Sequence, residues 1–301
     1  MIDEFYSHGK LLLTGEYVVL DGATALAIPT AKGQSLTVSS VDGDQLLWTS
    51  LEEQGECWFE AVFSSELEVE ATNDVAVAQS LQKMLKVACV LNPKFSSEIQ
   101  GSLVTTKLEF PRDWGLGSSS TLLNNIAQWA EVDAFQLGNV SFGGSGYDIA
   151  AAQNDQPILY RRNENKPIIS PITLEWNFTA QLFFVHLNIK QDSKEGIDRY
   201  QATLEDNGSI HTQISKISKA MVASKTLSAF TQLLNEHEGL ISERVDLPTV
   251  KSRLFNDYPG AIKSLGAWGG DFILATGGVR EHNYFRKKGF NTIIPFEEMM
   301  A

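Results

Sequence analysis

The chain has 301 residues, of which 43% are hydrophobic and 20% are charged. This composition is ordinary for a globular protein of about two domains, and it excludes disorder over the whole chain. Its 24 lysines and arginines against 37 aspartates and glutamates give a net charge of −13, so repulsion argues against a nucleic acid or an anionic membrane as partner. A local basic site can still hold a small anion.

The two cysteines, Cys57 and Cys89, have no CxxC neighbour, so a structural zinc site is excluded by count and a disulfide framework is not expected. The first residues lack the basic start and the long apolar core of a signal peptide. No apolar run approaches the roughly 18–20 residues that a membrane span needs. We therefore expect a soluble, cytoplasmic protein with two reduced thiols, and its oligomeric state cannot be inferred.

Apolar runs and turn residues predict strands in the first half of the chain at 11–13, 26–28, 34–48 (a hairpin around Asp42-Gly43-Asp44), 57–63 and 97–110. Apolar residues at helical spacing predict a helix over 73–91, whose start either Asn73 or Asp74 can cap. Two turns rich in glycine and serine, at 113–120 and 142–146, each lead into a helix. A polar stretch that contains proline, 161–171, is the best candidate for a domain boundary.

Beyond that stretch, elements of both kinds are predicted: two strands within 172–187, helices around 210–221 and 230–241, a strand at 272–275, a helix that ends near 289 and a strand at 292–296. The sequence contains no internal repeat and no low-complexity tract. The elements predict an α+β protein in two domains, residues 1–170 and 171–301.

The turn at 113–120 is a candidate phosphate-binding segment. Its glycines allow the backbone to approach a ligand closely, and the hydroxyl residues that follow open a helix whose free N–H groups favour an anion. We call residues 115–121 the phosphate loop: Gly115, Leu116, Gly117, Ser118, Ser119, Ser120 and Thr121. The structural alternative is that Ser118 or Ser119 only caps the helix.

Three further segments contain residues suited to chemistry. Asp148 follows the second glycine turn, where it is either a positioned base for a substrate hydroxyl or a helix cap. Lys10 beside Gly9 either neutralises a transferring phosphoryl group or lies on the surface. The glycine-rich run at 266–270 either approaches a ligand or forms a buried bulge.

Together, in this order, the four segments resemble the motifs of the GHMP kinases, the superfamily of galactokinase, homoserine kinase, mevalonate kinase and phosphomevalonate kinase. They read HGKLLLTGEYVVLDG from His8, GLGSSST from Gly115, SGYD from Ser145 and SLGAWGGD from Ser264. The resemblance covers nearly the whole chain, residues 7–271. The run GGSGYDIAAA is similar to a bacterial subgroup named for its Gly-Tyr-Asp-Ile-Ala string, which is described as mevalonate-kinase-like.

The resemblance implies a two-domain fold, with an N-terminal domain like the second domain of ribosomal protein S5 and a ferredoxin-like C-terminal domain. It also implies transfer of the γ-phosphoryl group of ATP, with Mg²⁺, to a hydroxyl or phosphate of a small molecule. Ser119 and Ser120 would hold the triphosphate together with backbone N–H groups, and Ser119 would contact the metal. Asp148 would orient or deprotonate the attacking hydroxyl, and Lys10 would keep Asp148 ionised and offset the γ-phosphate charge.

The same resemblance places further motif residues on the substrate side of the site or in the last motif: Glu16, Tyr17, Ser145, Gly146, Gly266, Ala267, Trp268, Gly269 and Gly270. Three positions depart from the family pattern. His8 stands where proline is usual, Leu137 where mevalonate kinase has its magnesium-binding glutamate, and Trp268 where small residues are usual. Asp133 or Glu131 could replace the missing acid, or water could complete the metal shell.

The acceptor signals conflict. Mevalonate kinases have a histidine where this chain has Tyr17, as some phosphomevalonate kinases do, whereas the Ser145–Asp148 element is typical of mevalonate kinases. An isoprenoid precursor is favoured, mevalonate before phosphomevalonate. The alternatives are a sugar or amino-acid kinase of the superfamily, and a catalytically silent protein of this fold that binds a ligand or partner.

Overall fold

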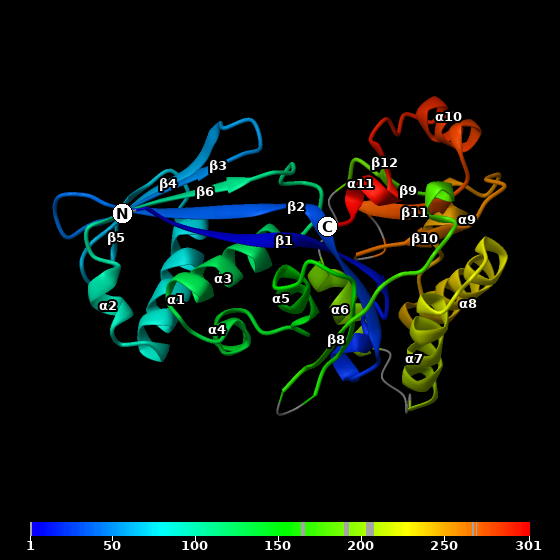
Figure 1. Cartoon of the computed structure of the whole chain (residues 1–301), viewed down its shortest axis with the longest axis horizontal. Helices are drawn as coiled ribbons and strands as arrows, with labels where there is room; N and C mark the ends of the chain where they lie inside the picture. The colour runs from blue at the N-terminus through cyan, green and yellow to red at the C-terminus, as the bar shows by residue number, and fades with distance from the viewer. Residues whose placement is uncertain (1, 164–165, 190–192, 203–207, 267, 269) are drawn as a thin grey trace. The chain divides into compact units, whose positions relative to one another are not determined.

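The structure, a computed structural model, describes residues 2–163, 166–189, 193–202, 208–266, 268 and 270–301 (Figure 1). The described chain divides into two compact units. The N-terminal unit contains residues 2–9, 32–112 and 117–153, and the C-terminal unit contains residues 10–31, 113–116 and 154–301. This differs from a single boundary near residue 170, because the long strands β1 (Ile2–Thr14) and β2 (Ala25–Ser40) each contribute one half to either unit.

In the N-terminal unit, a twisted sheet has the strand order β5-β4-β3-β6-β2, and β1 pairs with β2. The added elements are β3 (Leu46–Leu51), β4 (Cys57–Phe63), β5 (Val69–Thr72), β6 (Ser102–Leu108), α1 (Val75–Leu91), α2 (Phe95–Glu98), α3 (Ser118–Trp129), α4 (Ala134–Ser141) and α5 (Tyr147–Ala152). Figure 1 shows these helices along one side of the strands. Between them lies a core built on large side chains such as Trp48, Phe59 and Phe95.

The hairpin predicted over residues 34–48 is wrong. β2 and β3 are not neighbours, because β6 lies between them, antiparallel to β2 and parallel to β3. The connection at Gly43 packs against Gly101, at the start of β6, and Val41 N–H donates to the Gly101 carbonyl at 2.8 Å. A pairing with a strand sixty residues away therefore replaces the local one.

One further predicted element of this unit is confirmed and another is confirmed in part. Helix α1 begins after Asp74, whose carboxylate accepts from the backbone N–H groups of Ala76 and Val77, which is the capping that the sequence indicates. The strand predicted over 97–110 is shorter than expected, since it begins only at Ser102 and helix α2 precedes it.

The C-terminal unit contains a four-stranded antiparallel sheet of order β10-β11-β9-β12, and the first half of β2 pairs with β7, which pairs with β8. Its elements are β7 (Ile158–Arg161), β8 (Ile168–Pro171), β9 (Leu182–His186), β10 (Ile262–Ser264), β11 (Phe272–Thr276), β12 (Ile293–Pro295), α6 (Ser193–Ala202), α7 (Gly208–Val222), α8 (Leu227–Val245), α9 (Val250–Leu254), α10 (Val279–Lys287), α11 (Phe296–Met299) and the short 3₁₀ helices η1 (Val18–Asp21) and η2 (Thr179–Gln181). Of the two strands predicted within 172–187, only β9 is present.

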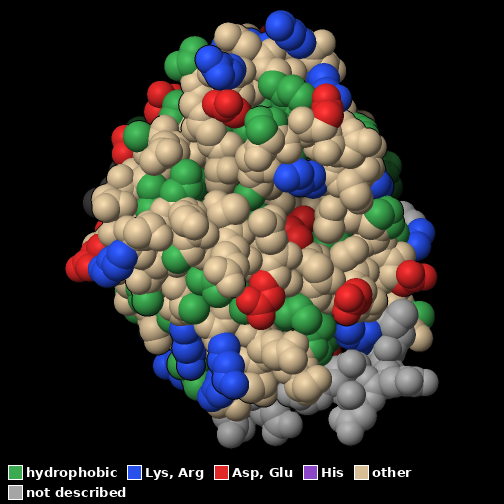
Figure 2. Space-filling view, turned by 90° about the vertical axis from the view of Figure 1, so that its right-hand side faces the viewer, with side chains coloured by type: hydrophobic (Ala, Val, Ile, Leu, Met, Phe, Trp, Pro, Cys, Tyr) green, Lys and Arg blue, Asp and Glu red, His purple; other side chains and the backbone are tan. Residues whose placement is uncertain are grey.

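Aromatic side chains dominate the core of the C-terminal unit, where Phe183, Phe255 and Phe285 pack together. On the face shown in Figure 2, acidic and basic side chains are interspersed and hydrophobic side chains form small, separate groups. Both cysteines are free thiols. None of the helices in the described part of the chain is long and apolar enough to cross a membrane.

Candidate functional site

Lys10 lies against the start of the phosphate loop. The Lys10 ammonium donates to the Gly115 carbonyl at 2.9 Å, and its backbone N–H donates to the Leu116 carbonyl at 2.8 Å. The side chain is partly buried, at the point where β1 becomes fully buried over residues 11–14. The first and second motifs, about a hundred residues apart in the chain, therefore meet within the C-terminal unit.

The last motif reaches the same place through Asp271. A Cβ atom on Gly115 would lie only 2.5 and 2.7 Å from the two carboxylate oxygens of Asp271, and Gly115 has a φ of +65°. Only glycine satisfies both constraints. Asp271 is itself held in place, because its backbone carbonyl accepts from Leu187 N–H at 2.7 Å and its N–H donates to the Ile189 carbonyl at 2.6 Å. Asp271 is the last residue of the fourth motif, and the sequence alone indicated no role for it.

The rest of the phosphate loop begins helix α3 in the N-terminal unit. Gly117, with a φ of +91°, precedes the helix, and the first N–H groups of any α-helix lack partners within the helix. The Ser120 hydroxyl donates to the Gly117 carbonyl at 2.9 Å, and the buried Thr121 hydroxyl donates to Gln34 Oε1 at 2.6 Å. These two hydroxyls hold the loop itself.

Ser118 and Ser119 differ from the two hydroxyl residues that follow them. Ser119 is exposed and Ser118 is partly buried, and in the described part of the chain neither hydroxyl forms a hydrogen bond. An exposed hydroxyl beside free helical N–H groups suits a phosphate or a hydrated cation. The predicted roles of the phosphate loop stay predictions, and Ser119 has the geometry that best suits a ligand contact.

Asp148 stands in the first turn of α5, a helix that packs against α3. α5 also begins after a glycine with positive φ, Gly146 at +80°, and Asp148 is partly exposed. The side chain is not used as an N-cap, because Gly146 occupies that position. Lys10 and Asp148 belong to different units, so their predicted pairing stays a prediction.

An uncharged polar network fixes the helices that carry these groups. The buried Ser7 hydroxyl donates to Asn125 Oδ1 and accepts from the Asn124 amide, both at 2.7 Å. Gln153, just after α5, donates to Asn124 Oδ1 at 2.9 Å, and Asn125 donates to the Gln34 carbonyl at 2.9 Å. The two consecutive asparagines inside an apolar helix pattern were the signal that sequence reasoning passed over.

Glu16, predicted on the substrate side, lies in a buried cluster of charges in the C-terminal unit, and its predicted role stays a prediction. Its carboxylate contacts the Lys263 ammonium, which lies 3.0 Å from Glu238 Oε1, and the other Glu238 oxygen accepts from the Ser264 hydroxyl at 2.7 Å. The side chains of Glu16 and Lys263 are each only 1% exposed. The cluster joins the turn after β1, helix α8 and strand β10.

The cluster holds two carboxylates against one ammonium. His237 adds no positive charge, because its Nε2 accepts from Gly15 N–H at 3.0 Å and burial lowers its pKa well below the usual range. Burial raises the pKa of Glu16 to about 7, although the Lys263 ammonium acts in the opposite direction. The two carboxylates keep the pKa of Lys263 raised despite its own burial. Sequence reasoning gave His237 no role and did not single out Lys263 or Glu238.

The remaining predicted residues are largely buried. Tyr17 is 7% exposed and stacks on Tyr200 at 6.0 Å between ring centroids, and a Cβ on Gly196 would lie 2.8 Å from the Tyr17 ring. Trp268 is 1% exposed, with the Lys263 ammonium 5.6 Å from its ring centroid. Ser145 is partly buried just before α5, Gly266 has a φ of +59° and Gly270 is buried. Ala267 and Gly269 lie outside the described residues.

Leu137 stands where mevalonate kinase has a magnesium-binding glutamate. It is fully buried in α4 as part of the hydrophobic core, so this position cannot hold a metal. The Asp133 carboxylate caps α4 by accepting from Gln136 N–H at 2.9 Å. Among the described residues, no group of three or more His, Cys, Asp or Glu side chains could hold a metal ion.

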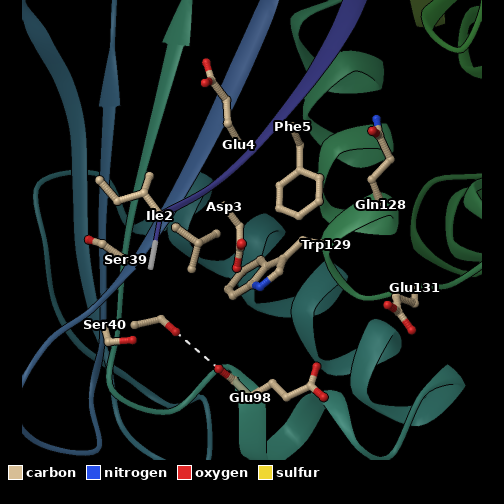
Figure 3. A pocket seen from close by; sticks show the side chains of 12 residues that line it. Ile2, Asp3, Glu4, Phe5, Ser39, Ser40, Glu98, Gln128, Trp129 and Glu131 are labelled. Carbon is tan, nitrogen blue, oxygen red and sulfur yellow. Dashed lines mark hydrogen bonds between the residues drawn. The ribbon is translucent and has the colours of Figure 1, made fainter.

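A pocket of about 580 Å³ in the N-terminal unit is distinct from these groups (Figure 3). It is lined by the start of β1, the end of β2, Trp129 and four acidic residues, namely Asp3, Glu4, Glu98 and Glu131. None of its described lining residues is basic, and none belongs to the four motifs. Such a pocket would repel a phosphate, so it is not the predicted site.

Comparison with known proteins identifies the fold. No protein-family model matches the sequence, and no curated protein sequence matches it. A solved structure from Listeria innocua is similar with a TM-score of 0.75 at 16% identity, covering 98% of this chain and 97% of that one. The mevalonate kinase of Methanococcus jannaschii has a TM-score of 0.70 at 16% identity, covering 98% and 96%.

The phosphomevalonate kinase of Streptococcus pneumoniae, in complex with phosphomevalonate and AMPPNP, is also similar, with a TM-score of 0.70 at 14% identity and 95% of each chain covered. At these identities the likeness shows the fold. The chain has the α+β fold of the GHMP kinases, as the four motifs predict.

Proposed function

We propose that this chain is an ATP-dependent kinase that transfers the γ-phosphoryl group to a small molecule, with mevalonate as the favoured acceptor and phosphomevalonate as the second candidate. The observation that carries the proposal is the meeting of Lys10, Gly115 and Asp271 in one place. Three of the four motifs thus converge on the loop expected to bind phosphate. A fold kept only as a scaffold has no need for a partly buried lysine there.

The phosphate loop supplies the donors for the triphosphate. An anion bound there would accept hydrogen bonds from the backbone N–H groups at the start of α3 and from the hydroxyls of Ser118 and Ser119. It would also lie at the positive end of the helix dipole. Lys10, an ammonium with three donors, adds a full positive charge at Gly115. Phosphoryl transfer needs this kind of positioning and charge stabilisation more than covalent chemistry.

Asp148 is the residue we assign to the acceptor hydroxyl. As a carboxylate on a short helix that packs on α3, it has a fixed place, and the Asn124 and Gln153 contact holds the two helices together. Asp148 would orient the hydroxyl and accept its proton as the bond to phosphorus forms.

Mg²⁺ fits this site only with help from the substrate. Ser119 offers one exposed hydroxyl, and Leu137 offers none. Magnesium commonly keeps several waters and takes its other ligands from substrate phosphates. When bound, the ion would offset the negative charge that builds up between the β- and γ-phosphates.

The competing function is a silent protein of this fold that binds a ligand. The buried Leu137 favours it, since the acidic metal ligand is absent. The convergence at Gly115 opposes it. A sugar or amino-acid kinase is the alternative within the fold.

The test is release of ADP from magnesium ATP in the presence of mevalonate, phosphomevalonate, galactose or homoserine. We expect turnover on one acceptor, which Asp148→Asn removes while ATP affinity stays nearly unchanged. The matched control is Asp155→Asn, an exposed aspartate outside the motifs, which should retain the wild-type rate.

Two results would count against the proposal. ATP binding without turnover on any of the four acceptors would favour the silent protein. A variant Asp148→Asn that keeps more than about a tenth of the wild-type kcat/KM would remove Asp148 as base, because that loss corresponds to less than roughly 1.4 kcal/mol of transition-state stabilisation.

A further inference from the structure

We infer that the C-terminal unit carries a second anion site, a basic pocket that takes a small molecule bearing a phosphate group. The pocket has a volume of about 380 Å³ and lies between helix α7, the end of β7 and the segment that enters β2. We call it the α7 pocket. It contains no residue of the phosphate loop, and the inference does not depend on the proposed kinase activity.

Positive charge gathers in the α7 pocket. Arg161 comes from β7, and Lys216 and Lys219 come from one face of α7, with His211 on the same helix. None of the described lining residues is acidic. The pocket of Figure 3 differs, because four acidic residues line it, as expected in a chain with a net charge of −13.

Among the described residues, none acts as a counter-ion to the three cations. Within the described ranges, no side chain forms an ion pair or hydrogen bond with the side chains of Arg161, Lys216 or Lys219. Like charges three residues apart on a helix repel each other, so this arrangement destabilises the empty pocket. A bound dianion would remove that repulsion.

Asp21, which precedes the lining residue Gly22, is already occupied. The Asp21 carboxylate accepts from the Tyr200 hydroxyl at 2.5 Å and lies 4.0 Å from His211 Nε2. It is absent from the described lining of the pocket. Asp21 therefore holds Tyr200 and His211 and does not neutralise the lysines.

The walls of the pocket are fixed before any ligand binds. Thr24 N–H donates to the Ser215 hydroxyl at 2.8 Å, and the Ser218 hydroxyl donates to the Thr24 carbonyl at 2.8 Å, so two bonds join α7 to the start of β2. Arg162, next to Arg161, donates to the Leu20 carbonyl at 3.0 Å and ties β7 to η1. A rigid site loses less entropy on binding than a flexible one.

The donor set fits a phosphate. An arginine binds two phosphate oxygens at once through its planar guanidinium, and lysines add point charges around it. Thr212 and Ser215 line the same pocket, where the Ser215 hydroxyl donates to the His211 carbonyl at 2.6 Å. The volume lies at the lower end of the range for small-molecule sites, about 300–1,000 Å³, and suits a phosphate ester or a diphosphate. A nucleic acid is excluded by the overall negative charge.

The test is isothermal titration at low ionic strength with three probes: inorganic phosphate, pyrophosphate and glycerol 3-phosphate. The pocket variant is Lys216→Gln with Lys219→Gln. The control is Lys107→Gln with Lys287→Gln, two exposed lysines elsewhere that change the net charge by the same amount. All four lysines are exposed, so both variants should fold, which circular dichroism checks.

We expect the wild type and the control variant to bind pyrophosphate or the ester alike, and the pocket variant to bind at least about tenfold more weakly, since two charge-assisted contacts are lost. Any anion bound at the phosphate loop is retained in both variants and therefore does not contribute to the difference. Tighter binding of the ester than of inorganic phosphate would identify an organic ligand, and equal binding would identify an inorganic one.

Two results would overturn the inference. An equal loss of binding in both variants would mean that only the long-range charge of the protein acts on the probes. Equal affinity in the pocket variant and the control would mean that no anion binds between α7 and β7.

Discussion

Removing the ammonium from the buried charge cluster should strongly destabilise the C-terminal unit. Lys263→Met keeps a side chain of similar length but leaves Glu16 and Glu238 buried without a cation. At 3.0 Å and an effective dielectric constant of about 20, the attraction between unit charges is about 5 kcal/mol. Breaking a buried pair by removing one partner costs about 3–5 kcal/mol, and we expect a loss in that range at pH 8.

The loss should shrink in acid. At pH 5 the orphaned carboxylates can take up protons, whereas at pH 8 both must stay charged or be protonated at high cost. The matched control is Lys225→Met, which breaks an exposed pair with Glu175 whose side chains are 66% and 73% exposed. Exposed pairs contribute about 0–1 kcal/mol, so this variant should be nearly unchanged at either pH.

The assay is urea unfolding followed by tryptophan fluorescence, together with hydrogen exchange of the β10 and β11 amides, which reports on this unit alone. A second variant, Glu16→Gln with Lys263→Met, removes charges of both signs and should recover part of the loss. The reasoning is refuted if Lys263→Met loses no more stability than Lys225→Met, or if its loss is the same at pH 5 and pH 8.

The remaining predictions concern single substitutions. In Gly43→Ala the new Cβ meets no atom within 4 Å, so the variant should lose only the roughly 1–2 kcal/mol of stability that a left-handed non-glycine residue costs. In Gly115→Ala the new Cβ also collides with the Asp271 carboxylate, so the loss of stability should be clearly larger. Equal shifts in Tm would contradict this. Ser119→Ala should leave Tm unchanged but slow the reaction at subsaturating magnesium ATP, whereas Thr121→Val should lose about 1–3 kcal/mol of stability, because its buried hydroxyl is bonded. An unchanged rate in Ser119→Ala would remove that residue from the metal shell. Because burial raises the pKa of Glu16 from 4.5 to about 7, the native state binds more protons between these values, and stability should fall by about 3 kcal/mol as pH rises through that window; Glu16→Gln should abolish this slope, and an unaltered slope in urea titrations would contradict the assignment.

Local signals predicted the local structure well. Helix α1 was identified from its apolar spacing, and Asp74 was one of its two candidate caps beside Asn73, because both depend on residues a few positions apart. The hairpin over 34–48 failed because the partner of each strand is β6, and a turn sequence at Asp42-Gly43 carries no information on a strand sixty residues away.

The site was predicted in part for the same reason. The four motifs identified Lys10 and the phosphate loop, and the structure joins these through the Gly115 carbonyl. The role of Asp271 against Gly115 could not be predicted, because it depends on a distance between residues 156 positions apart. The burial of Lys263 could not be predicted from the sequence, because a lysine is normally exposed. Its two carboxylate partners, Glu16 and Glu238, come from other elements of the fold.

The two units hold their polar interiors by different chemistry, and this has a consequence for how the protein responds to its surroundings. The network of Ser7, Asn124 and Asn125 contains no group that ionises between pH 4 and 9. Acid or salt therefore leaves unaltered the hydrogen bonds that hold α3, the helix that begins in the phosphate loop. The interior around Glu16 changes its charge near neutrality. A change of pH near 7 therefore acts first on the C-terminal unit, while the segments that begin α3 and α5 keep their hydrogen bonds.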